Sequence, residues 1–279
     1  MVMALFFVSG ASAQTRSDYA QSLMADHDFF RAISVYKELA FFSKDPDSTV
    51  HFLMQAGKAY RLSGHYMLAI TTFGDIGGDF ALSPYQSVEV DMNLGLSYLG
   101  MNVPAQSISF FQEAQKTDTT HLSNLFLGLT YCQLGEWNFA RKEYKDAVRR
   151  GSSSIAGRLG SEFLSTLSKS NKIPHRSPLL ASILSSVLPG SGQLYCGHDV
   201  DALQALAFVS AFAFTSYMAY RYDSKFTHDY VLTGISLSLT GIFHLANILG
   251  AERTAEYFNQ RQKDLFIDNI RNRTMDLDF

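Results

Sequence analysis

Two uncharged segments in the second half of the chain restrict its fold more than any other feature. They cover residues 202–220 and 230–250, which are separated by the nine residues RYDSKFTHD. A helix rises about 1.5 Å per residue and the hydrocarbon layer of a bilayer is about 30 Å thick, so each segment is long enough to cross it. The pattern predicts a transmembrane helical hairpin. The alternative is a pair of buried helices in a soluble protein, but a chain of 279 residues offers little protein to cover them.

The stretch SSVLPGSGQLYCG, just before the first of these segments, interrupts a third uncharged region. A phosphate-binding loop would need a lysine after its last glycine, and a dinucleotide fingerprint would need a strand-to-helix turn; neither pattern is present. We expect a short amphipathic or re-entrant helix over residues 178–188 and a bent turn over residues 189–197, with side-chain partners for the exposed backbone groups. The candidate functional residues of this turn are Pro189, Gly190, Gly192, Gln193, Tyr195 and Gly197.

Residues 177–197 read SPLLASILSSVLPGSGQLYCG, and the two uncharged segments follow. This arrangement resembles a recurrent bacterial membrane module with the pattern S-P-x-x-A-x-x-L-S-x-x-x-P-G-x-G-Q-x-Y-x-G and two spans. The resemblance covers residues 177–250 and implies no known chemistry. Polar residues within a membrane are functional candidates, so His244 and Asn247, on nearly one face of the second span, are singled out. The alternative is that His244 packs or bonds across the hairpin near a helix end.

A repeat occupies the first half of the chain. The segments 52–76, 90–114 and 123–147 align in register. Small residues would let two antiparallel helices approach closely, and aromatic residues would fill the space between neighbouring pairs, which predicts a solenoid of helical hairpins. The repeated positions are Gly57, Gly95 and Gly128; Tyr60, Tyr98 and Tyr131; Ala69, Ser107 and Ala140; Phe73, Phe111 and Tyr144; and Ile76, Ala114 and Ala147, with Trp137 added in the last copy.

These positions resemble the skeleton of tetratricopeptide (TPR) repeats, with about four copies over residues 14–150. The resemblance implies an all-α, TPR-like solenoid with a concave groove that binds proteins, without specifying which groove residues make the contacts. A generic helical bundle is the alternative, but repetition in register across three copies disfavours it. Residues 151–176 are expected to hold a capping helix and a linker.

The ends of the chain give conflicting signals about orientation. Residues 1–13 resemble a signal peptide, with cleavage after Ala13. Basic residues are more frequent outside the two spans than between them, which favours both flanks in the cytoplasm. A crossing by residues 178–197 would allow the repeats to lie outside. We expect a bacterial membrane location, with the inner membrane favoured and the repeats on the periplasmic side. Residues 251–279 are expected to form an amphipathic tail along the surface.

Composition and motifs exclude several function classes. The formal net charge of -3 argues against nucleic acid as a partner. The eight histidines show no metal-ligand spacing, and no catalytic constellation is present. We therefore expect no enzyme, no cofactor and no metal. The sequence favours a membrane-anchored scaffold of the cell envelope that binds protein partners through its groove and the lipid bilayer through its spans. The alternative is a membrane module that handles a lipid, an ion or a small solute and is regulated by the repeats.

Overall fold

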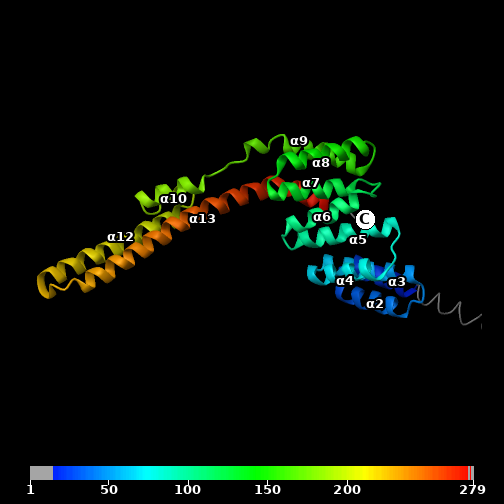
Figure 1. Ribbon diagram of the computed structural model, residues 1–279, viewed down its shortest axis with the longest axis horizontal. Helices are drawn as coiled ribbons and strands as arrows, with labels where there is room; N and C mark the ends of the chain where they lie inside the picture. Colours follow the sequence, from blue (N-terminus) through cyan, green and yellow to red (C-terminus); the bar gives the residue numbers. More distant parts are fainter. Residues whose placement is uncertain (1–14, 276, 278–279) are drawn as a thin grey trace, which may run out of the picture. The chain divides into compact units, whose positions relative to one another are not determined.

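The computed structural model describes residues 15–275 and 277, and within these residues it contains helices and no strand (Figure 1). The helices form two compact units. Of the described residues, the first unit takes 15–170 together with those from Ile267 onward, and the second takes Asn171–Phe266. The signal peptide predicted over residues 1–13 lies outside the described residues. The expected all-α class, a helical-hairpin solenoid followed by an apolar helical hairpin, is confirmed.

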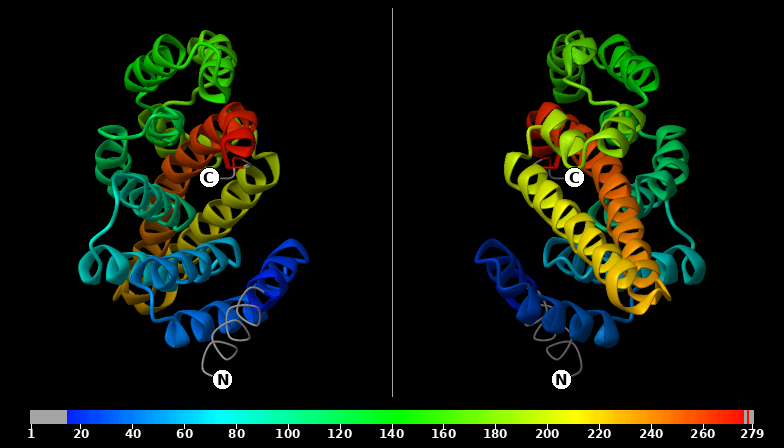
Figure 2. Two further views of the ribbon diagram at one scale, coloured as in Figure 1. Left: turned by 90° about the vertical axis from the view of Figure 1, so that its right-hand side faces the viewer. Right: turned by 90° about the vertical axis from the view of Figure 1, so that its left-hand side faces the viewer.

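Consecutive helices of the first unit pair into hairpins, and each hairpin packs on the next. Figure 2 shows these helices following an arc, coloured from blue to green. A helix over residues 15–25 pairs with α2 (Phe29–Phe42), α3 (Pro46–Leu62) with α4 (Tyr66–Asp79), α5 (Pro84–Gly100) with α6 (Pro104–Gln115), and α7 (Leu122–Leu134) with α8 (Trp137–Arg150). The predicted capping helix is α9 (Ile155–Leu167), which packs against α8.

Local signals set where α3 and α5, the first helices of two hairpins, begin. Asp45 precedes α3, and its carboxylate accepts the Ser48 N–H at 2.9 Å. Ser83 precedes α5 in a capping box with Gln86. Proline follows each cap, where its missing N–H is harmless. Residues 80–83 link α4 to α5, so the additional residues of this repeat lie in the end of α4 and this link.

The repeated small residues are the points at which paired helices touch. A Cβ atom added to Gly57 would lie 2.7 Å from the ring of Phe73. The same atom on Gly95 would lie 2.5 Å from Phe111. Because these aromatic side chains are completely buried, they cannot swing away. The small-aromatic pairs therefore fix the spacing of the hairpins.

The other repeat positions complete the same packing. Ala69, Ala114, Ala140 and Ala147 are buried, and Trp137 is half-buried at the start of α8. The repeated tyrosines stack on the second helices of their hairpins: the ring centroids are 5.4 Å apart for Tyr98 and Phe110 and 5.2 Å apart for Tyr131 and Phe139. Tyr60 packs against the buried core around Phe73.

The second unit contains the apolar helices. After the short 3-10 helix η1 (Ser170–Lys172), it comprises α10 (Pro178–Val187), α11 (Ser191–Tyr195), α12 (Asp199–Tyr222), the π-helical turn η2 (Asp223–Thr227) and most of α13 (Val231–Met275). Two described stretches, Asp199–Thr227 and Val231–Met275, are long and apolar enough to cross a membrane. The closing turn is held by Asp223, whose carboxylate accepts the N–H of Thr233 at 2.9 Å.

The segment predicted as the second span and the segment predicted as a tail form one continuous helix, α13, whereas the sequence suggested a span over 230–250 followed by a separate tail. Residues 251–275 contain no proline or glycine that would end the helix. Ala, Glu, Gln and Arg, all of which favour helix, recur along them. From Ile267 onward, α13 belongs to the unit of the repeats.

Candidate functional site

A polar ladder joins the first helices of the second and third hairpins. The ammonium group of Lys58 on α3 lies 2.6 Å from the carboxylate of Glu89 on α5, and both side chains are mostly buried. One turn further along each helix, the Arg61 guanidinium donates to the Asn93 side chain at 3.0 Å. Because these groups pair with one another, the ladder fixes how the two hairpins meet.

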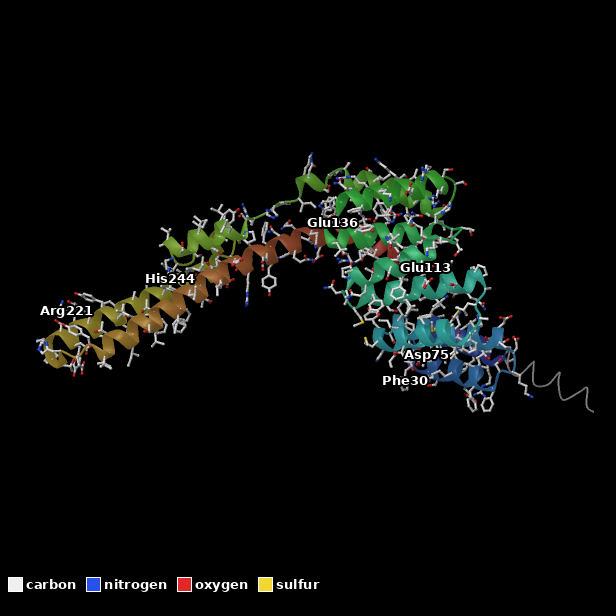
Figure 3. The ribbon with its side chains drawn as sticks, viewed as in Figure 1. Phe30, Asp75, Glu113, Glu136, Arg221 and His244 are labelled. Carbon is white, nitrogen blue, oxygen red and sulfur yellow. The ribbon has the colours of Figure 1, made fainter. Side chains whose placement is uncertain are left out.

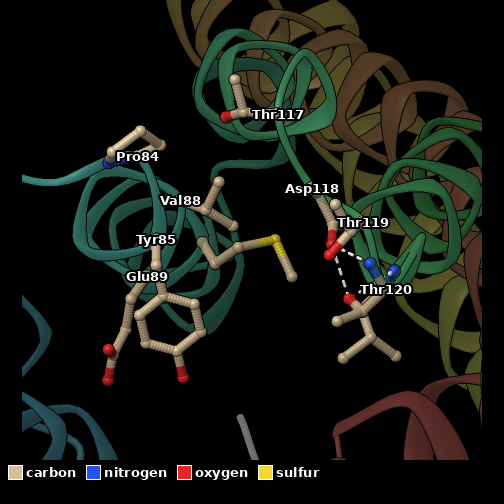
Figure 4. Close-up of a pocket in the computed structure, with 10 residues that line it drawn as sticks. Pro84, Tyr85, Val88, Glu89, Thr117, Asp118, Thr119 and Thr120 are labelled. Carbon is tan, nitrogen blue, oxygen red and sulfur yellow. Dashed lines mark hydrogen bonds between the residues drawn. The ribbon is translucent and has the colours of Figure 1, made fainter.

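A cavity of about 460 Å³ opens between the first turn of α5 and the loop from α6 to α7 (Figure 4). Tyr85, Val88 and Met92 line it from α5, and residues 117–120 line it from the loop. Its size falls in the range of sites that hold small ligands or a few side chains of a bound peptide. Tyr85 is 72% exposed, so its ring is available to a partner.

Asp118 gives one wall of this cavity a fixed shape. Its carboxylate accepts the Thr120 N–H at 2.8 Å and the Ser123 N–H at 2.9 Å. Burial raises the pKa of Asp118, but the hydrogen bonds from Thr120 and Ser123 outweigh that effect and hold the pKa below its usual value. Figure 4 shows the bonds to Thr120. Asp118 therefore serves to shape the loop that ends at α7.

The carboxylate of Asp91 on α5 has a raised pKa, in contrast to the lowered pKa of Asp118. Burial, together with the nearby Glu113 carboxylate, raises the pKa of Asp91 to about 6, and Lys116 offsets this only in part. A folded-state pKa above the unfolded value means that the fold favours the protonated acid. The free energy of unfolding should then fall as pH rises from about 4 to 6. Above about pH 6 the full loss caused by ionising Asp91 should persist.

Asp91→Asn should therefore stabilise the protein at pH 7.5 and have little effect at pH 4. We expect a gain of about 1 kcal/mol, less than the full pKa shift implies, because the side chain is partly solvated. Thermal unfolding of the full chain in detergent at both pH values measures this. Asp75→Asn is the control, since Asp75 is exposed on α4. Equal gains for Asp91→Asn at both pH values would contradict the argument.

The bent turn after α10 is held by a network of buried side chains. The Ser185 hydroxyl donates to the Gln193 side-chain oxygen at 3.0 Å and accepts the Gly192 N–H at 2.9 Å. The Asn247 side-chain oxygen accepts the Gly190 N–H and the Gln193 side-chain N–H, both at 3.2 Å. The Asn247 amide N–H donates to the Ser185 carbonyl at 3.3 Å. Ser185 of α10, Gly190 to Gln193 at the start of α11 and Asn247 of α13 are thus hydrogen-bonded to one another.

Two glycines of the turn are required by their surroundings. Gly190 has a φ of +87°, and a Cβ atom there would lie 2.1 Å from the Ala202 carbonyl oxygen. A Cβ atom on Gly192 would lie 2.1 Å from the Ala181 carbonyl oxygen. Only glycine fits such close approaches of backbone to backbone.

The remaining predicted turn residues lie around this network. Pro189 is half-buried where α10 ends, and Gly197 has a φ of +81° just after α11. The Tyr195 hydroxyl accepts the Ser177 N–H at 3.2 Å, and its ring lies 4.9 Å from the Arg176 guanidinium. The turn is thereby tied to the residues just before α10.

The two polar residues predicted on the second span are brought to the turn. Asn247 is part of the network above, and the His244 ring Nε2 donates to the Ser186 carbonyl of α10 at 3.2 Å. Figure 3 shows His244 near α10 and Arg221 at the closed end of the hairpin. The sequence singled out both residues but not their partners, because the contacts join positions more than fifty residues apart.

Sequence reasoning also missed two links. Asn259 donates to the Arg176 carbonyl and accepts the Arg176 N–H, both at 2.7 Å, which ties α13 to the residues just before α10. Ile267 and Ile270, near the end of α13, are completely buried. The sequence signal for the second link was incomplete, since Ile267 and Ile270 are apolar positions spaced at i and i+3, but Leu265 and Phe266 beside them are apolar as well.

Two side chains that could take part in chemistry, Cys132 and Glu143, are buried within the repeats. Burial raises the pKa of the Cys132 thiol to about 12, so it is not a nucleophile near neutral pH. Glu143 is buried and accepts hydrogen bonds from Gln115 and Asn124, at 2.9 and 3.0 Å. In the described part of the chain, no three His, Cys, Asp or Glu side chains are grouped so as to hold a metal ion.

Comparison with known proteins gives little beyond the fold. No protein-family model and no curated protein matches the chain. Among solved structures, a tetratricopeptide repeat protein from Parabacteroides merdae ATCC 43184 is similar, with 12% identity over 87% of this chain and 99% of that chain and a TM-score of 0.45. At this level of similarity, neither the function of that protein nor its arrangement transfers to this chain.

Proposed function

We propose that this chain is a non-enzymatic, membrane-anchored scaffold of the bacterial cell envelope that binds protein partners through the inner face of its repeats. The observation that carries the proposal is the cavity of about 460 Å³ between successive hairpins. It opens beside the exposed ring of Tyr85, and aromatic side chains of this kind often anchor protein interfaces. Stacked hairpins supply a rigid, curved support for such a site.

The α12–α13 hairpin supports membrane anchoring. In the most apolar stretch of the first span, only 17% of the residues are buried within the protein. In the most apolar stretch of the second span, 6% are buried. Large apolar side chains such as Phe208 and Ile242 are more than 60% exposed. An exposed apolar surface of this extent needs a cover, and lipid provides one along the whole length of both helices.

Both flanks of the hairpin share one side of the membrane in this proposal. The ten residues of α10 extend about 15 Å, half of the hydrocarbon thickness. The chain then folds back, since Gly192 bonds to Ser185 of α10. With two crossings, the repeats and the end of α13 lie on one side, in keeping with their membership of one compact unit. We assign that side to the periplasm from the N-terminal segment, against the basic residues, which favour the cytoplasm.

Cysteine accessibility tests this topology. Tyr85→Cys on the repeats and Asn269→Cys near the end of α13 should react with a membrane-impermeant reagent from the same side. Lys225→Cys, between the spans, should react only from the other side. The native Cys132 and Cys196 are both buried and give a low background. Labelling of Tyr85→Cys and Asn269→Cys from opposite sides would mean that residues 178–197 cross the membrane.

Partner binding is tested by placing a photoreactive residue in the full chain in cells. At position 85 we expect one cross-linked protein, identified by mass spectrometry, and at Met67, which is exposed on α4, we expect none. Val88→Arg should fill the cavity and abolish both the cross-link and binding of the purified partner. Equal cross-linking at positions 85 and 67, or none at position 85, would argue against the proposal.

The alternative, a module that handles a lipid, an ion or a small solute, has less support. The polar groups of the turn that would serve such a solute, those of Ser185, Gln193 and Asn247, bond to one another. A network satisfied in this way favours a structural role for the turn.

A further inference from the structure

The end of α13 is an amphipathic segment held by the repeats. Ile267, Ile270 and Thr274, spaced at i, i+3 and i+7, are completely buried, while Asn269 and Asn272 between them are exposed. A single buried stripe on a helix means that one face is covered. Since this segment belongs to the compact unit of the repeats, the cover is the solenoid itself.

The receiving surface is the inner face of α7. The contacts of α7 with α6 use Phe126, which stacks on Phe111, and its contacts with α8 use Gly128, which meets Tyr144. Leu125 and Leu129, one turn apart, lie on the face that remains, and both are completely buried. Figure 2 shows the red end of α13 on the inner side of the arc of repeat helices.

The inner face of α5 continues this surface. Met92 and Leu96, also one turn apart, are 2% and 3% exposed. Met92 also lines the cavity that opens toward Tyr85. The apolar inner face is thus covered over part of its length and open at the start of α5.

An ion pair orients the bound segment. Arg273, on the exposed side of α13, pairs with Glu162 of α9. The segment therefore offers two kinds of contact, an apolar stripe for α5 and α7 and a basic side chain for α9.

We infer that the inner face of the repeats recognises an amphipathic helix with apolar residues at i and i+3 and a basic residue on its flank, and that residues 267–275 occupy this site as an intramolecular competitor. This inference rests on the proposed function and specifies its partner. A segment in the same chain is present at a high effective concentration. A partner helix therefore binds only to the fraction of molecules whose tail is released, which weakens its apparent affinity by that fraction.

Release of the tail should expose the site to a helix supplied from outside. The probe is a fluorescent peptide with the sequence of residues 261–275, added to the full chain in detergent micelles. The variant Ile267→Asp/Ile270→Asp should bind it at least tenfold more tightly than the wild type. Asn269→Asp/Asn272→Asp adds the same charge on the exposed face and should bind like the wild type. A peptide carrying Ile270→Asp should not bind.

Trypsin cleavage after Arg271 and Arg273 reports tail release independently. Cleavage should be faster in Ile267→Asp/Ile270→Asp than in the wild type. Arg273→Glu, a change to a partly exposed side chain, should give a severalfold gain in peptide binding without affecting folding. A chain with accelerated cleavage and unchanged peptide binding would overturn the inference, as would unchanged cleavage in Ile267→Asp/Ile270→Asp.

Cross-linking at position 85 separates this inference from the proposed function. Stronger cross-linking of the partner in the tail-release variant supports both. Equal cross-linking in the two chains overturns the competition and leaves the scaffold in place. Peptide binding without cross-linking of any partner overturns the scaffold and leaves the internal contact in place.

Discussion

Gly128→Ala is expected to lower the free energy of unfolding by about 3 kcal/mol. The added Cβ atom would lie 2.2 Å from the ring of Tyr144, which is completely buried between α7 and the next helices. An overpacked core site of this kind costs about 1–3 kcal/mol, and relief requires moving a whole hairpin. Thermal or denaturant unfolding of the full chain in detergent measures the loss.

Gly74→Ala is the matched control for this substitution. Gly74 also lies within a repeat helix, but no atom is within 4 Å of an added Cβ. Here alanine should stabilise the helix by about 0.5–1 kcal/mol, because it lowers the entropy lost on folding. If Gly128→Ala and Gly74→Ala had the same effect, the close approach of α7 to Tyr144 would be disproved. Adding Tyr144→Leu to Gly128→Ala should recover part of the loss by making room.

Asn247→Leu is expected to have a comparable effect on the second unit. Leucine has a similar size but leaves the Gly190 N–H, one Gln193 side-chain N–H contact and the Ser185 carbonyl without this partner. Each buried polar group left unsatisfied costs about 1–3 kcal/mol. We therefore expect a loss of about 3 kcal/mol, seen as a lower unfolding midpoint in detergent.

Asn272→Leu provides the comparison on the same helix. Asn272 is exposed, so its replacement should change stability by about 0.5 kcal/mol or less. An equal midpoint for Asn247→Leu and the wild type would show that the turn does not depend on the network.

The repeats could be predicted from the sequence because their packing is local. Gly57 meets Phe73 within one hairpin, and the same pairing recurs in register in the next two copies. The same pairing at the same spacing in each copy predicts the same helical hairpin in each. The repeat period then predicts that these hairpins stack. The apolar hairpin could also be predicted from the sequence, since the length of its two segments and their lack of charge suffice.

The sites depend on contacts that no local pattern contains. The turn residues Gly190 and Gln193 were identified as a group, but their common partner Asn247 lies on a different helix. Likewise, Ile267 and Ile270 look like one face of a surface helix until the repeats are folded around them. Pattern reasoning finds the polar or apolar character of a position, and the partner emerges only from tertiary packing.

The network at the turn also dictates an order of events during synthesis of the chain. The hydrogen bonds that Asn247 makes in this network join residues separated by 54 to 62 positions. While the ribosome is still making the second span, the N–H of Gly190 has no Asn247 to bond, and unpaired backbone groups are excluded from the hydrocarbon interior. If the hairpin spans a membrane as proposed, the α10–α11 segment therefore stays in water or at the lipid headgroups until the hairpin is complete, and it docks last.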